Sequence, residues 1–147
     1  FLTAYGWYVS QAAALVPPTE GAEYPYWAFL NGRGLDPSAG GRVLTLEVPR
    51  DQAVFFDLLD WNRILQLRFL GEEKEEKQFR RELELRGLDT QKVMLSAFYP
   101  EWKAQVFKSW ERLFRWHSAI RDGEENPVES VQAGLWCIRR EWEVSGL

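Results

Sequence analysis

The sequence predicts an α+β domain in which a small mixed β-sheet is flanked by several α-helices. Short apolar runs that alternate with polar residues, or that end at Pro and Gly, are typical of strands, and they occur near residues 25–30, 43–48 and 130–140. Longer stretches with apolar residues at helical spacing separate and flank these runs. The 147 residues, 46% of them apolar and 27% charged, suit one globular domain over 1–147 with one core.

The first predicted elements are a helix, a loop and a strand. Over 1–16 apolar residues recur at helical spacing, and Pro17 stops the run. The Gly-rich stretch 31–42 has the composition of a loop. Residues 42–48 alternate between two faces, one of them clearly apolar, until Pro49 ends the alternation. This pattern predicts a strand.

An aromatic run at 24–30, "YPYWAFL", predicts another strand. Both of its alternating faces are apolar, so we expect this strand inside the sheet. One face is expected to meet helices and the other to border a pocket. In that arrangement Trp27 is packed, and Tyr24 or Tyr26 lies nearer the pocket.

The second half of the chain predicts three helices and a last strand. Asp57 can cap a helix that runs to about residue 70. Residues 72–86 carry Glu and Lys or Arg at i,i+4 spacing over a thin apolar side, which predicts a charged outer helix. A strongly amphipathic helix is expected over 99–116, and the alternation over 130–140 predicts a strand buried on both faces.

Composition argues against several classes of site. A net charge of −4 leaves no basic face for phosphates, which argues against nucleic acid as a partner. One cysteine, Cys137, excludes an internal disulfide, and Cys137 with His117 is too small a set for a zinc site. Cys137 is expected in the core and His117 at a helix end as a surface cation, so we do not expect a nucleophilic pair.

No apolar run approaches the length of a membrane span, and no signal-peptide pattern occurs. A single cysteine also fits a reducing compartment. We therefore expect a soluble cytoplasmic protein without a membrane partner.

Six segments resemble an uncharacterised bacterial family, a domain of unknown function found in small soluble proteins. In chain order they are "AYGW", "YPYWAF", "LTLEVP", "FFDLLDWNRIL", "SWERLF" and "VQAGLW". Members usually open with an upstream strand that carries Thr-x-Gln, which is absent here. Since the chain also begins at Phe1, within a predicted helix and without Met, we expect that it lacks a native N-terminal segment that adds a strand.

A second departure concerns position 62. In many members His follows the Trp that matches Trp61, whereas this chain has Asn62. An amide cannot titrate, so a mechanism that needs a proton-transferring imidazole there is in doubt for this chain.

The order of elements is also loosely similar to the ADP-ribosyltransferase superfamily, in which a small split sheet binds NAD. This is a similarity of fold, and it bears on function only by analogy. It implies NAD as a cofactor, and it implies Glu129 and Gln132, at the start of the last strand, as catalytic residues near the reacting sugar carbon. A carboxylate there would stabilise developing positive charge. A simpler interpretation is that Gln132 bonds a neighbouring backbone group.

A planar ligand is expected in a pocket between the 24–30 strand and the 57–65 helix. Its binding residues are Tyr5, Tyr26, Arg42, Asp57, Trp61 and Asn62, together with Gln132. Aromatic rings would stack on the ligand, the guanidinium would hold a phosphate, and the carboxylate and amides would orient it. The simpler interpretations are a helix cap for Asp57 and core packing for Trp61.

Two classes of function remain open. The first is an NAD-binding or nucleotide-binding enzyme that transfers ADP-ribose, or an inactive version that only binds. The second is a non-catalytic protein-interaction module that uses exposed aromatic side chains, which eight Trp and a 15% aromatic share could supply. A contiguous exposed apolar patch would favour the module, and a concave, partly polar pocket would favour the enzyme.

Overall fold

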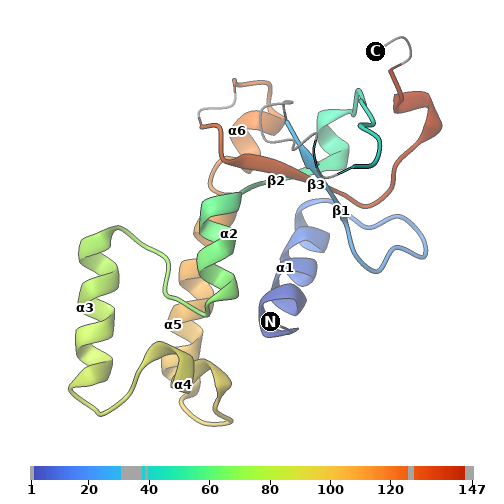
Figure 1. Cartoon of the computed structure of the whole chain (residues 1–147). Coiled ribbons are helices and arrows are strands. Elements are labelled where there is room, and N and C mark those ends of the chain that lie inside the picture. Colours follow the sequence, from blue (N-terminus) through green and yellow to red (C-terminus); the bar gives the residue numbers. More distant parts are fainter. Residues whose placement is uncertain (1, 31–37, 39, 126–127, 145–147) are drawn as a thin grey trace.

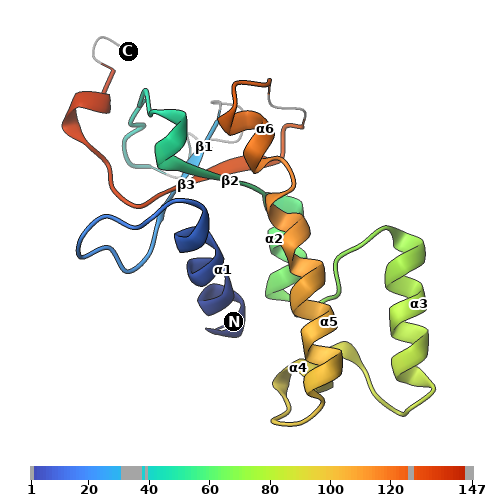
Figure 2. The ribbon, with the colours of Figure 1, turned by 180° about the vertical axis from the view of Figure 1, so that it is seen from behind.

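A computed structural model describes residues 2–30, 38, 40–125 and 128–144 (Figure 1). The fold is α+β, as predicted, with a small sheet at one end of the molecule and helices packed on it and extending away from it. Figure 2 shows from behind that α2 and α5 run side by side away from the sheet, with α3 beyond them. Among the described residues, no helix has both the length and the apolar character needed to cross a bilayer.

The sheet contains three strands in the order β1-β3-β2. They are β1 (Tyr26–Phe29), β2 (Ala53–Asp57) and β3 (Val131–Leu135). Both pairings are antiparallel, where a mixed sheet was expected. The prediction that the 24–30 strand lies inside the sheet is wrong, because β3, which is buried on both faces, takes the central place and leaves β1 at an edge.

The predicted strand at 42–48 is reduced to one isolated bridge, Leu46 to Glu143. Val43 and Leu44 are exposed, and only Leu46 and Val48 of the apolar face pack, partly buried, against the core. β2 forms instead from the apolar run that follows, and all five of its residues are buried. The longer buried run prevails because burial, more than alternation, stabilises a strand in a small sheet.

The four predicted helices are present, and each is shorter than expected. They are α1 (Leu2–Leu15), α2 (Leu58–Leu65), α3 (Glu73–Glu84) and α5 (Pro100–Trp110). Two further helices were not predicted, α4 (Thr90–Leu95) and α6 (His117–Arg121). The cap at Asp57 is confirmed, since its Oδ1 accepts the backbone N–H of Leu59 at 3.0 Å.

The two faces of the sheet bury different clusters. One face carries Val54 and Phe56 and packs on Tyr8 of α1 and on Trp61 of α2. The opposite face carries Phe55 and packs with other apolar residues, including Ile120, Val131, Ala133 and Leu135. The contacts of the Tyr8 ring with Phe56 and Trp61 therefore hold α1 and α2 against the first face of the sheet.

Candidate functional site

Three aromatic residues from α1, β1 and α2 meet on the first face of the sheet. The ring centroid of Tyr5 lies 5.1 Å from that of Trp61 and 6.3 Å from that of Trp27, and the two Trp rings are 5.4 Å apart. Trp61 is only 1% exposed, so it is a core residue rather than an open stacking surface. Trp27 packs on the same cluster yet stays 37% exposed, which leaves part of its indole at the surface.

Gln132 lies on this same face. In the register of the sheet it pairs with Phe29 on one side and Phe56 on the other. The residue is only 8% exposed, and no hydrogen bond joins its amide to any other described residue. Its amide atoms are not among the fully buried polar atoms that lack a partner, so solvent reaches them. The simple expectation that its side chain bonds a neighbouring backbone group is therefore not met.

Other predicted site residues lie elsewhere. Tyr26 is the neighbour of Trp27 in β1, and Asp57 is the neighbour of Phe56 in β2. Because successive side chains of a strand alternate between faces, both lie on the opposite face. Asn62 and Arg42 are exposed, and Arg42 belongs to the segment before the isolated bridge. Glu129 is exposed in the turn before β3. The structure thus joins Tyr5, Trp61 and Gln132 on one face and does not join all the predicted residues in a single pocket.

A charged cluster that the sequence analysis missed lies at the start of α2. Arg115 pairs with Asp57 at 3.6 Å, and Asp60 is 5% exposed one turn further along. Burial, and then the neighbouring Asp57, raise the pKa of Asp60, while Arg115, Arg112 and Arg63 oppose that shift. A buried carboxyl with a raised pKa is suited to proton exchange.

Two atoms of this cluster are buried without a partner among the described residues, Oδ2 of Asp60 and Nε of Arg112. One is an acceptor and the other a donor, so a water or a hydroxyl could satisfy both. The sequence did contain a signal, because Asp57 and Asp60, like Arg112 and Arg115, stand three residues apart. What the sequence could not supply is the contact between these two pairs across the fold.

His117 is buried beneath β2, so the expectation of a surface cation is wrong. Its Nδ1 accepts the backbone N–H of Phe55 at 3.1 Å. Burial, the largest cause, lowers the pKa of His117, with Arg121 adding to the shift and Asp122 opposing it. Cys137 is half-buried, and no hydrogen bond between described residues connects it to His117.

The bond from Phe55 to His117 predicts a pH-dependent stability. The folded pKa lies below the unfolded value of about 6.5, so stability is complete above that pH and falls as the pH decreases toward the folded pKa. In His117→Asn, Oδ1 replaces Nδ1 as acceptor and does not titrate. We expect the loss of melting temperature between pH 7.5 and pH 5.5 to be clearly smaller in this variant, measured by differential scanning calorimetry.

The contributions of other titrating groups, such as Asp60, to the pH dependence of the melting temperature are common to the wild type and the variant, so they cancel in the difference between the two. His117 is the single histidine of the chain, which assigns any difference in slope to it. Equal slopes for the variant and the wild type would contradict the prediction.

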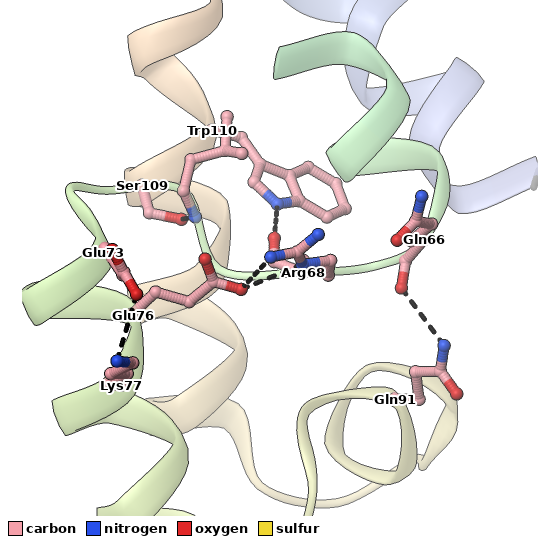
Figure 3. Close-up of polar contacts among 9 residues, drawn as sticks. Gln66, Arg68, Glu73, Glu76, Lys77, Gln91, Ser109 and Trp110 are labelled. Carbon is pink, nitrogen blue, oxygen red and sulfur yellow. Dashed lines mark hydrogen bonds and ion pairs between the residues drawn. The ribbon is translucent and has the colours of Figure 1, made fainter. Parts of the chain in front are cut away.

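A cavity of about 260 Å³ lies at the C-terminal end of α2 (Figure 3). Its walls are the segment 66–69, one side of α3 and the start of α4. This is not the pocket that we expected between the 24–30 strand and the 57–65 helix. Among the described residues, no three His, Cys, Asp or Glu side chains are grouped to hold a metal ion.

Comparisons with known proteins agree with the predicted resemblance. A family model described as a domain of unknown function (DUF3841) matches residues 1–144. No curated protein and no solved structure matches the chain. The similarity to the ADP-ribosyltransferase fold therefore stays a prediction.

Proposed function

The chain belongs to the DUF3841 family of domains of unknown function, and we propose that this domain is a protein-interaction module which adds an extended partner segment to the open edge of β1. The observation that carries the proposal is the contrast between the two edges of the sheet. No described strand pairs with the outer side of β1. β1 also exposes large apolar side chains, with Tyr26 at 57% and Phe29 at 47%.

Proteins usually protect an edge strand with a charge, a proline, a bulge or a covering element, since a bare edge pairs with other chains. The segment 24–30 contains no charged residue, and Pro25 stands just before β1 rather than within it. At the other edge, β2 is fully buried, and His117 accepts the N–H of Phe55. Within the part of the chain that the structure describes, one edge is thus closed and the other has no partner strand.

The chemistry of β1 defines the partner segment. Its unpaired backbone groups require an extended strand, and its uncharged side chains on both faces require apolar or aromatic residues at the paired positions. A charged residue opposite Trp27 or Phe29 would lose hydration without a counter-charge. The partner is therefore an uncharged, β-prone segment of another protein.

Selection from a displayed library of random peptides tests this proposal. We expect the selected peptides to alternate apolar residues and to slow amide hydrogen exchange within Tyr26–Phe29. Phe29→Lys should weaken their binding by at least about tenfold, because it places a charge at the paired face. Leu85→Lys is the matched control, since Leu85 is exposed at the C-terminal end of α3, a helix that lies away from the sheet in Figure 1, and should leave binding unchanged.

Two outcomes would contradict the proposal. In the first, selected peptides protect amides elsewhere and leave β1 unchanged. In the second, β1 is already protected in a dimer that dissociates on dilution, which would make a second copy of the chain the occupant.

A second candidate function, binding of a planar ligand such as NAD or a nucleotide, is favoured by one observation. The Gln132 side chain is mostly buried beside Phe29, and its amide forms no hydrogen bond with a described residue and is not among the fully buried polar atoms, so a ligand at the surface could reach it. A nicotinamide carboxamide or a base edge would supply both a donor and an acceptor, with the exposed part of Trp27 as a stacking surface. Transfer of ADP-ribose would then use Glu129 near the sugar carbon, without an imidazole at Asn62.

Gln132→Leu separates ligand binding from stability. Gln132 makes no hydrogen bond with a described residue, so replacing its mostly buried amide should change the free energy of unfolding by no more than about 1 kcal/mol. The same change should abolish the heat of binding and the thermal shift that we expect with millimolar NAD or nicotinamide. Gln105→Leu, at an exposed position of α5, is the control. Wild-type protein that gives no heat and no thermal shift would remove this candidate.

A further inference from the structure

We propose that the cavity at the C-terminal end of α2 binds a free α-amino acid with an apolar side chain. Its volume of about 260 Å³ far exceeds the roughly 10–15 Å³ that one water needs. It is just below the range of roughly 300–1,000 Å³ that is usual for small-ligand pockets. The cavity shares no wall with β1 or Gln132, so the proposal does not depend on the function proposed above.

Hydrogen bonds hold the walls of the cavity in place (Figure 3). Trp110 donates from Nε1 to the carbonyl of Arg68 at 2.7 Å, and the Arg68 guanidinium donates twice to Oε1 of Glu76, at 2.6 and 2.8 Å. At the other end Gln91 donates from Nε2 to the carbonyl of Gln66 at 3.3 Å. A site whose walls are already fixed loses little conformational entropy when it binds a ligand.

The backbone at the cavity wall is strained. Leu67 has a φ of 57°, in the left-handed region that a branched aliphatic residue rarely occupies. Burial of its side chain and a hydrogen bond from its N–H to the carbonyl of Ile64 hold this conformation. Such strain persists only where the surroundings enforce it, and it is often found at binding sites.

Two opposite charges at the mouth of the cavity, both on exposed residues, have no ion-pair partner among the described residues. Arg80 and Glu84 lie one turn apart on α3 and both line it. Neither forms an ion pair with any other residue that the structure describes. Asp89, which also lines the cavity, is engaged, because its Oδ1 accepts the N–H of Lys92 at 2.8 Å. The cavity therefore offers one free cation and one free anion.

This arrangement matches a zwitterion. Side chains at i and i+4 of a helix start about 5–6 Å apart, so a carboxylate on Arg80 and an ammonium on Glu84 can belong to one small molecule. Phe69, which is half-buried, forms the apolar part of the lining that would receive an apolar side chain, whereas the side chain of Leu67 is buried in the core. The acidic residues at the cavity outnumber Arg68 and Arg80, which disfavours a phosphate-bearing ligand.

Isothermal titration with L-leucine, N-acetyl-L-leucine and L-leucinamide tests the proposal. The first probe has both charges, the second lacks the ammonium and the third lacks the carboxylate. We expect L-leucine to bind at least roughly tenfold more tightly than either derivative. Arg80→Gln and Glu84→Gln should each weaken L-leucine by about two- to fivefold, because both side chains are exposed, whereas Arg81→Gln, whose side chain does not line the cavity, should not.

Three results would overturn the proposal. One is the absence of heat with millimolar L-leucine when the protein is folded by circular dichroism. Another is equal binding of L-leucine and N-acetyl-L-leucine. The third is unchanged affinity in both Arg80→Gln and Glu84→Gln.

Discussion

Gly134→Ala is expected to lower the free energy of unfolding by about 2–3 kcal/mol, because the new methyl group has no room in the centre of the sheet. Its Cβ would lie 2.5 Å from the hydroxyl oxygen of Tyr8. Gly134 pairs with Trp27 on one side and Val54 on the other, so the strand cannot move away without breaking both pairings. Urea denaturation followed by Trp fluorescence measures the loss.

Tyr8→Phe is the control for this prediction, because it removes the hydroxyl that the new methyl group would meet. The Tyr8 hydroxyl is buried without a partner among the described residues, and burial raises its pKa above the ordinary value. Tyr8→Phe should therefore leave stability within about 1 kcal/mol of the wild type. The next atoms that the new methyl would meet are 3.6 Å away or more, so Tyr8→Phe should restore most of the stability that Gly134→Ala removes. An additive double variant would show that the strain has another source.

Trp61→Ala is expected to cost about 3–5 kcal/mol, the range for loss of a buried indole. Trp61 contacts the rings of Tyr5, Tyr8 and Trp27, and these contacts join α1, α2 and β1. Since a domain of this size has about 5–15 kcal/mol of stability, the variant should be partly unfolded at 37 °C. Thermal melting by circular dichroism measures this effect.

Asn62→Ala is the matched control, at the next position of the same helix. Asn62 is exposed, so its replacement should change stability by no more than about 0.5 kcal/mol. If Trp61→Ala were as mild as Asn62→Ala, Trp61 would not be the core residue that its burial indicates.

Four of the helices were predictable because local rules decide them, whereas the short α4 and α6 were not predicted. Asp57 caps α2 through its own side chain, and the i,i+4 charges of 72–86 coincide with α3. The strands were less predictable, since a strand requires a partner far along the chain. Alternation marked 42–48, but only Leu46 forms a bridge, whereas Ala53–Asp57 gained burial on both faces that periodicity cannot reveal.

In the candidate site, too, features set by the local sequence pattern were predictable and features set by contacts across the fold were not. Core packing of Trp61 was the simpler interpretation of its position and agrees with its burial, and the position of Gln132 on a mostly apolar face followed from alternation, but the contact of Trp61 with Tyr5 was not predicted. The face on which Tyr26 lies depended on the register with β3. The cavity walls could not be predicted, because the backbone of Leu67 and the bond from Trp110 to Arg68 arise from contacts across the fold.

The central place of β3 has a consequence for synthesis on the ribosome. β1 and β2 bond only to β3, which follows them by about a hundred and about seventy-five residues respectively. Trp136, just after β3, also donates from Nε1 to the carbonyl of Val16, 120 residues earlier. While the chain is still emerging, both early strands wait unpaired with their aromatic residues in water. The sheet therefore cannot form until residue 135 has left the exit tunnel, and until then both early strands are exposed to aggregation.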